Sequence, residues 1–220
     1  MINSLKCIIF DFDNTLVKSN IDFPGMKIEM ARLTKNFGLE FGSEEEIPHK
    51  YTAGNIIEKA ESFDKRNGTM LVPQLWQVVE EYERKGMENI TIDQDVLTML
   101  NSMKSFKIET ALLTNNACNP TVEVLKKFNM MDYFSIIVAR EDVKKMKPDK
   151  EGIDLILSKM NLLPNEVIFI GDSWIDAKAA NKAGVPFVLI RNDLLDVQKY
   201  DITIWKHIRS MTELGQIIEK

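Results

Sequence analysis

Short apolar runs alternate with amphipathic segments along most of the chain. Six short segments that are mainly apolar occur, at residues 7–10, 108–113, 136–138, 167–170, 187–190 and 202–205. Runs of this length are typical of parallel strands that are buried on both faces. Five segments between or after them have helical periodicity, at residues 93–106, 119–129, 148–160, 176–183 and 211–218. Strands that alternate with helices predict a parallel sheet with right-handed crossovers, which is a doubly wound α/β domain.

Residues 18–89 break this alternation. They contain no apolar strand run, and three of their segments have the pattern of amphipathic helices, namely residues 26–37, 43–63 and 72–86. Ser43 and Glu46 form a capping-box pattern at the start of the second segment. A connection between a strand and the next helix usually takes only a few residues. We therefore predict a helical domain of residues 18–89, inserted into a Rossmann-like core of residues 1–17 and 90–220.

Composition narrows the classes of function. Apolar residues make up 45% of the chain, which is ordinary for a globular protein. The 28 Lys and Arg residues against 33 Asp and Glu residues give a net charge of −5, which offers no electrostatic basis for binding nucleic acid. No apolar run has the length of a membrane span, and residues 1–6 are too short for a signal peptide. With Cys7 in a predicted strand and Cys118 in a loop, we expect no stabilising disulfide and a cytoplasmic location.

Polar side chains directly follow several of the predicted strands. Asp11 and Asp13 follow the first strand, Thr114 and Asn115 follow the second, and Asp172 follows the fourth. In open α/β sheets, ligands bind outside the carboxyl ends of the strands, so we expect these side chains at one edge. Two neighbouring carboxylates repel each other unless a cation lies between them or one of them is protonated.

Two further residues belong to the same edge. Lys147 precedes a proline at a predicted helix start, and Asp176 lies at the head of another predicted helix. Each polar residue of this edge also has a simpler interpretation as a turn, a helix cap or a solvated side chain. Their joint placement instead predicts a site for phosphoryl transfer. Carboxylates without His or Cys partners favour Mg²⁺, and lysine and hydroxyl groups suit phosphoryl oxygens.

The order of these residues resembles four motifs of the haloacid dehalogenase superfamily. The motifs are Asp11-x-Asp13-x-Thr15, Thr114-Asn115, Lys147-Pro148 and Gly171-Asp172-x-x-x-Asp176. The inserted helical domain is similar to the α-helical cap of the phosphoglycolate phosphatase-like branch. The resemblance covers the chain outside the insertion. It implies a phosphoric monoester hydrolase that uses Mg²⁺ and an aspartyl-phosphate intermediate to act on a small phosphorylated metabolite.

The resemblance also implies a role for each carboxylate. Asp11 would be the nucleophile and a Mg²⁺ ligand. Asp13 would be the general acid and base, and would bind the metal through its backbone carbonyl. Asp172 would be the remaining protein ligand, and Asp176 would support the metal ligands from behind. The residues alone do not decide which of the first two carboxylates attacks and which moves the proton.

The phosphoryl group would be held by the other motif residues. By the same resemblance, the Thr114 hydroxyl and the backbone N–H groups of Phe12 and Asn115 would bind its oxygens. Lys147 would hold the nucleophile and the phosphate together electrostatically.

The chain departs from the usual motifs at a few positions. Asn14 stands where glycine is common, but asparagine tolerates left-handed backbone geometry. Asp149 stands where a second proline is common, and Lys144 and Lys145 are competitors for the role of Lys147. We favour Lys147 because the following proline fixes it at a helix start.

Other functions share parts of this pattern. A phosphomutase of the same superfamily would have the same core and differ mainly in the cap. A receiver-like signalling domain, from a different class, also combines carboxylates, threonine and lysine at strand ends, but over a shorter length of chain. A catalytically silent, protein-binding member is a third alternative, which the intact motif set disfavours.

Overall fold

The computed structural model describes residues 5–191 and 199–218. The segment of residues 1–6, in which we expect no signal peptide, therefore lies partly outside the described residues. The chain divides into two compact units. One consists of Met1–Ser19 and Ile90–Lys220, and the other of Asn20–Asn89. We call them the core unit and the helical unit.

The core unit contains a six-stranded parallel sheet with the strand order β3-β2-β1-β4-β5-β6. The strands are β1 (Cys7–Phe10), β2 (Glu109–Leu113), β3 (Ile136–Val138), β4 (Val167–Gly171), β5 (Phe187–Ile190) and β6 (Lys206–Ile208). The chain order runs outward from β1 in both directions, so β1 lies at the point where the winding reverses. Ligands bind at such switch points in α/β sheets.

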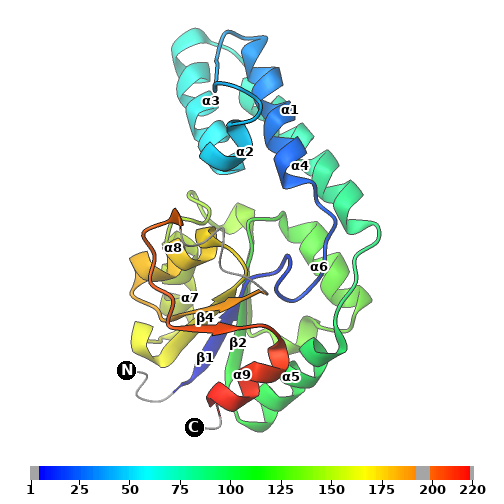
Figure 1. Cartoon of the computed structure of the whole chain (residues 1–220), viewed down its shortest axis with the longest axis vertical. Helices are drawn as coiled ribbons and strands as arrows, with labels where there is room; N and C mark the ends of the chain where they lie inside the picture. Colours follow the sequence, from blue (N-terminus) through cyan, green and yellow to red (C-terminus); the bar gives the residue numbers. More distant parts are fainter. Residues whose placement is uncertain (1–4, 192–198, 219–220) are drawn as a thin grey trace. The chain divides into compact units, whose positions relative to one another are not determined.

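Helices cover both faces of this sheet. They are α5 (Gln94–Ser105), α6 (Cys118–Lys127), α7 (Glu151–Met160), α8 (Trp174–Ala183) and α9 (Met211–Ile218), with short 3₁₀ turns η1 (Met131–Tyr133), η2 (Arg140–Asp142) and η3 (Pro164–Glu166). Figure 1 shows α7 and α8 on one side of the sheet and α5 and α9 on the other. The predicted doubly wound α/β fold is confirmed.

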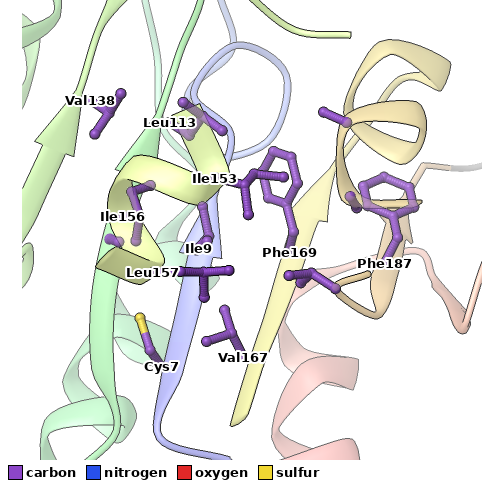
Figure 2. Packing of buried hydrophobic residues seen from close by; sticks show 14 of the residues in the cluster. Cys7, Ile9, Leu113, Val138, Ile153, Ile156, Leu157, Val167, Phe169 and Phe187 are labelled. Carbon is purple, nitrogen blue, oxygen red and sulfur yellow. The ribbon is translucent and has the colours of Figure 1, made fainter. Parts of the chain in front are cut away.

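The central strand is apolar throughout because both of its faces are covered. All four residues of β1 are fully buried. Successive side chains of a strand point to opposite faces. Cys7 and Ile9 belong to the cluster on the α7 side, where they pack with Ile153 and Ile156 of α7 and with Phe169 of β4 (Figure 2). Burying side chains of this size contributes about 1.5–3 kcal/mol each, so the sheet that positions the strand ends is firmly held.

The last strand lies later in the chain than predicted. Residues 202–205 are not a strand, and β6 comprises Lys206–Ile208. The backbone of Thr203 is bonded to a side chain instead, because its N–H donates to Asn181 Oδ1 (2.6 Å) and its carbonyl accepts from Asn181 Nδ2 (2.9 Å). Pairing with β5 begins only where the Trp205 N–H donates to the Phe187 carbonyl (2.9 Å).

The helical unit contains α1 (Phe23–Lys35), α2 (Ile47–Lys50), α3 (Ala53–Asn67) and α4 (Leu71–Met87). Its described residues form no strand longer than a bridge, in agreement with the helical pattern of its sequence. The core of this unit is apolar and centres on Met30, Ile56, Leu71 and Leu75, which are fully buried.

The predicted helix of residues 43–63 is wrong because the chain breaks it at Thr52. This residue has an extended backbone (φ −87°, ψ 161°). Its hydroxyl accepts from the Asn55 N–H (3.1 Å), and the Asn55 side chain accepts from the Thr52 N–H (3.2 Å). The capping box therefore begins α3, whereas the predicted box at Ser43 and Glu46 provides only a backbone hydrogen bond (3.1 Å).

The remaining expectations from composition concern cysteines and membranes. Cys7 and Cys118 are both free thiols. Within residues 5–191 and 199–218, every helix is too short or too polar to span a membrane.

Candidate active site

The ends of three strands meet at one edge of the sheet. β1 pairs in parallel with both β2 and β4. Asp11 follows β1 directly, and its N–H donates to the carbonyl of Ile170 in β4 (2.9 Å). Thr114 follows the end of β2, and Asp172 follows the end of β4. The sheet therefore places the first residues after these strands at the same edge.

The chain turns sharply after β1. Asn14 has the left-handed backbone that we predicted it would tolerate (φ 57°). Its N–H donates to the Val17 carbonyl (2.6 Å), which closes the turn. The Thr15 hydroxyl then donates to Asp11 Oδ2 (3.1 Å). The turn thus returns a hydroxyl to the carboxylate that precedes it and fixes one of the oxygens of Asp11.

Lys147 joins two buried carboxylates at this edge. Its Nζ lies 2.5 Å from Asp11 Oδ1 and 2.7 Å from Asp176 Oδ1, and it donates to the Leu113 carbonyl (3.0 Å). The lysine side chain is only 4% exposed. Burial alone would lower the pKa of Lys147, but the two carboxylates outweigh it and raise the pKa above its ordinary value. The ammonium group is therefore charged and fully bonded.

Two neighbouring lysines do not share this position. Lys144 and Lys145 are exposed, and their backbone N–H groups donate to the carboxylate of Glu151 (2.9 and 3.0 Å). Of these three lysines, the structure brings Lys147 to Asp11, and its predicted role in holding the nucleophile and the phosphate together stays a prediction.

The reason that we gave for this preference is wrong. We expected a helix from residue 148, but α7 begins at Glu151. The backbone of Lys147 is held instead by the side-chain amide of Asn115, which forms two hydrogen bonds with it. Asn115 Nδ2 donates to the Lys147 carbonyl (3.0 Å), and the Lys147 N–H donates to Asn115 Oδ1 (3.0 Å).

Ser173, in the loop after β4, holds the Asp176 carboxylate oxygen that does not contact Lys147. α8 begins at Trp174 rather than at Asp176, because Ser173 is its N-cap. The Ser173 hydroxyl (2.5 Å) and N–H (3.2 Å) both donate to Asp176 Oδ2. Gly171 makes room for this arrangement, since a Cβ atom there would lie 2.6 Å from the Cβ of Asp176.

The carboxylates form a cluster that could hold a metal ion. Asp11, Asp172 and Asp176 each offer an oxygen within 4.8 Å of the others. Burial raises the pKa of Asp11 and of Asp172, and repulsion from neighbouring carboxylates raises both further. A divalent cation would relieve this repulsion, and an all-oxygen donor set suits Mg²⁺. The metal-binding role of the Asp13 carbonyl stays a prediction.

Asp13 is held separately from this cluster. The Nδ2 of Asn116, a buried residue after β2, donates to Asp13 Oδ2. The other oxygen, Oδ1, is buried and has no hydrogen-bond partner among the described residues. Burial raises the pKa of Asp13, while the nearby Ser19 hydroxyl and the Asn116 amide lower it in part. The Ser19 hydroxyl lies near this carboxylate without a hydrogen bond of ordinary geometry.

Thr114 is buried at the end of β2, with 2% of its surface exposed. Its Oγ accepts from the Asn116 N–H (3.1 Å). Within the described residues its own hydroxyl proton has no protein acceptor, so it can donate to a ligand. The predicted use of the Phe12 and Asn115 N–H groups to bind phosphate stays a prediction.

Comparison with known proteins agrees with this geometry. Residues 8–190 match the model of the haloacid dehalogenase-like hydrolase family. The chain belongs to this family. Among its relatives, the phosphoglycolate phosphatase of Yersinia pseudotuberculosis is 28% identical over 84% of this chain and 80% of its own length. The phosphorylated carbohydrates phosphatase of Thermotoga maritima is 27% identical over 82% of each chain.

Solved structures of the family share the fold. A haloacid dehalogenase superfamily hydrolase of subfamily IA from Geobacter sulfurreducens has a TM-score of 0.60 and 21% identity, over 97% of this chain and 96% of its own. The prediction of a haloacid dehalogenase-like hydrolase is therefore confirmed. The phosphatase names of its relatives support a phosphoric monoester hydrolase.

Four polar side chains hold the active groups of this haloacid dehalogenase-like hydrolase in place, and none of their contacts was predicted from the sequence. They are Thr15 beside Asp11, the side chain of Asn115 beside Lys147, Asn116 beside Asp13, and Ser173 beside Asp176. A signal existed for Ser173, because Ser-x-x-Asp is a capping-box pattern. For the two asparagines no spacing rule applies, since their partners are distant in the chain.

Proposed function

We propose that this hydrolase is a Mg²⁺-dependent phosphatase that acts on a small phosphorylated metabolite through an aspartyl phosphate. The buried contact between Lys147 Nζ and Asp11 Oδ1 (2.5 Å) carries the proposal. A nucleophilic carboxylate must stay ionised in a site that excludes water, and burial opposes this. The lysine offsets part of that effect and places a positive charge beside the atom that would attack phosphorus.

The first half-reaction transfers the phosphoryl group to the protein. An Asp11 carboxylate oxygen forms a bond to phosphorus, and the bond between phosphorus and the leaving oxygen breaks. Asp13 donates a proton to that oxygen, so the product leaves as a neutral alcohol. Burial raises the pKa of Asp13, which favours the protonated form that this step requires.

The second half-reaction restores the enzyme. Asp13, now a carboxylate, takes a proton from a water molecule whose oxygen attacks phosphorus. The bond between phosphorus and the Asp11 oxygen breaks, and inorganic phosphate leaves. The same residue thus serves as acid and then as base, and protons balance over the cycle.

The remaining groups bind the phosphoryl oxygens. In this proposal the Thr114 hydroxyl and the N–H groups of Phe12 and Asn115 donate to them, and Lys147 neutralises part of their charge. The free donor capacity of the buried Thr114 hydroxyl supports its role. Preorganised donors of this kind stabilise charge that develops in the transition state.

The donor set fits the cation that the proposal requires. Asp11, Asp172 and the Asp13 carbonyl would hold Mg²⁺, and Asp176 would support them through its contacts with Lys147 and Ser173. When bound, Mg²⁺ supplies positive charge that lowers the repulsion between a phosphoryl dianion and the carboxylates.

The names of the relatives and the composition support the proposed substrate class. Relatives are named for phosphoglycolate and for phosphorylated carbohydrates. The net charge of −5 gives no basis for binding a polymeric anion. We propose that residues 18–89 act as a cap that selects the leaving group, while the core supplies the chemistry.

A substrate panel tests the proposal directly. The protein would be incubated with Mg²⁺ and with phosphoglycolate, sugar phosphates, nucleotides and nitrophenyl phosphate, and inorganic phosphate would be measured over time. Steady release from at least one small ester, with a phosphorylated protein detected after rapid acid quenching, is the expected result. Isomerisation of a sugar phosphate without phosphate release would instead indicate a phosphomutase, and a single stoichiometric phosphorylation would indicate a receiver-like protein.

A further inference from the structure

Asn116 is a buried residue that links the end of β2 to Asp13. It is 4% exposed and is held at three points. Its side-chain Nδ2 donates to Asp13 Oδ2, its backbone N–H donates to Thr114 Oγ (3.1 Å), and its carbonyl accepts from the Arg140 N–H (3.0 Å). A side chain fixed in this way can impose an orientation on the group that it contacts.

The two oxygens of Asp13 are in different environments. Oδ2 accepts from the amide of Asn116, whereas Oδ1 is buried and makes no hydrogen bond of ordinary geometry within the described residues, although the Ser19 hydroxyl lies near the carboxylate. An amide NH₂ group can only donate, so the oxygen that faces it must present a lone pair. The hydrogen bond from Asn116 therefore fixes the direction of the Asp13 carboxyl group.

We propose that Asn116 is a positioning residue that fixes the direction of the Asp13 carboxyl group through the hydrogen bond from its Nδ2 to Oδ2. The inference rests on the proposed phosphatase function. During phosphoryl transfer, Asp13 held in this direction donates its proton to the leaving oxygen while the bond between that oxygen and phosphorus breaks. Oδ2 keeps the hydrogen bond from Asn116 before and after the transfer, so the carboxyl group does not rotate between the two half-reactions.

A positioning role differs from a purely structural one in its dependence on the leaving group. Protonation matters most when the leaving oxygen is strongly basic, as in an alkyl phosphate, and little when it is weakly basic, as in dinitrophenyl phosphate. The ratio kcat/KM reports the steps up to departure of the leaving group, so it isolates the first half-reaction.

The experiment measures kcat/KM for ethyl, phenyl, nitrophenyl and dinitrophenyl phosphate in the intact protein with Mg²⁺. For Asn116→Ala we expect a loss of roughly 30-fold or more with ethyl phosphate and less than about threefold with dinitrophenyl phosphate. Asn116→Ser, whose shorter side chain cannot reach Asp13, should show the same trend if the alanine variant folds poorly. Asp13→Asn should show a steeper trend, and adding Asn116→Ala to it should cost little more.

Asn181→Ala provides a matched control. Asn181 also makes two side-chain hydrogen bonds in the core unit, but to the backbone of Thr203 rather than to a site residue (2.9 and 2.6 Å). Its loss should change kcat/KM by the same small factor for every ester.

Each outcome of this series is decisive. Equal losses for all esters in both Asn116 variants, or no loss at all, would overturn the positioning role while wild-type turnover still supports the phosphatase. Failure of the wild-type protein to hydrolyse any of the esters would instead contradict the proposed function itself, and the positioning role with it.

Discussion

The ion pairs at the strand ends of the core unit are buried, whereas the ion pairs within the described residues of the helical unit are exposed. In the core unit, the Lys147 side chain is 4% exposed, and it bridges Asp11 and Asp176, which are 9% and 3% exposed. In the helical unit, the partners of the Arg32–Glu44 pair are 65% and 52% exposed, and those of the Lys85–Glu81 pair are 60% and 54% exposed. Buried charges persist only when every partner is present, whereas exposed pairs contribute little.

This difference in burial indicates that charged pairs of the helical unit contribute little to its stability, whereas the charged groups of the core unit are placed for chemistry. The helical unit is held by apolar packing and by a capping box, so the partners of its exposed pairs Arg32–Glu44 and Lys85–Glu81 are replaceable. The core unit places like charges side by side at the strand ends, which is costly unless a proton or cation intervenes. Charged groups that oppose folding in this way often mark a functional site.

The largest expected effect comes from removing the nucleophile. Asp11→Asn keeps the shape of the side chain but leaves an amide that cannot form the phosphoenzyme, so kcat should fall by about 10³-fold or more. Phosphate release and acid-quench trapping measure this loss. The melting temperature should stay close to that of the wild type, because the substitution also removes a repulsive charge. Retained steady turnover would remove the nucleophile assignment.

Two lysine variants test whether a buried ion pair contributes more to stability than an exposed one. Lys147→Met removes the only cation in contact with two buried carboxylates of the described site, so unfolding free energy should fall by about 3–5 kcal/mol. Lys85→Met, in an exposed pair, should leave denaturation unchanged within error. Equal effects in urea denaturation would show that burial does not set the difference.

Metal and pH should act together on the core unit. Burial and repulsion raise the pKa of Asp11 from 3.8 to about 7. The folded metal-free protein then binds this proton more tightly than the unfolded chain, so stability should fall as the pH rises from about 4 to about 7. Mg²⁺ competes with protons for the same oxygens. Its stabilisation, about 2.7 kcal/mol at a concentration of 100 Kd, should be larger at high pH than at low pH.

Thermal denaturation with Mg²⁺ and with EDTA measures this effect at each pH. EDTA should also abolish activity, and added Mg²⁺ should restore it. If Mg²⁺ raises the melting temperature equally at low and at high pH, the metal does not bind to the carboxylates whose pKa is raised. Full activity without metal would contradict the proposed cation.

The smallest expected effect lies in the helical unit. Thr52→Ala removes the cap of α3 and should lower stability by about 1 kcal/mol. Ser43→Ala is the matched control, because Ser43 is exposed and contributes only backbone contacts. Neither variant should change kcat with nitrophenyl phosphate. A comparable loss at Ser43 would restore the capping box that the sequence pattern predicted there.

Local patterns succeeded where a single segment contains all the information. The strand of residues 7–10 was predicted from its apolar run, and the turn at Asn14 was predicted from the backbone tolerance of asparagine. Predictions failed where a competing polar contact decided the outcome. Thr52 interrupts a continuous amphipathic pattern. The Asn181 side chain forms hydrogen bonds with the Thr203 backbone, which the predicted strand would have used for pairing.

The sequence by itself determined the fold class and the residues that gather at the strand ends. It did so because apolar periodicity sets the elements, and parallel strands bring their carboxyl ends together. Only the tertiary structure decided how these residues are held. Asn115 fixes Lys147 across 32 positions of sequence, and Asn116 reaches Asp13 across 103. Such contacts leave no periodic trace in the chain, because a hydrogen bond depends on where two atoms meet in space.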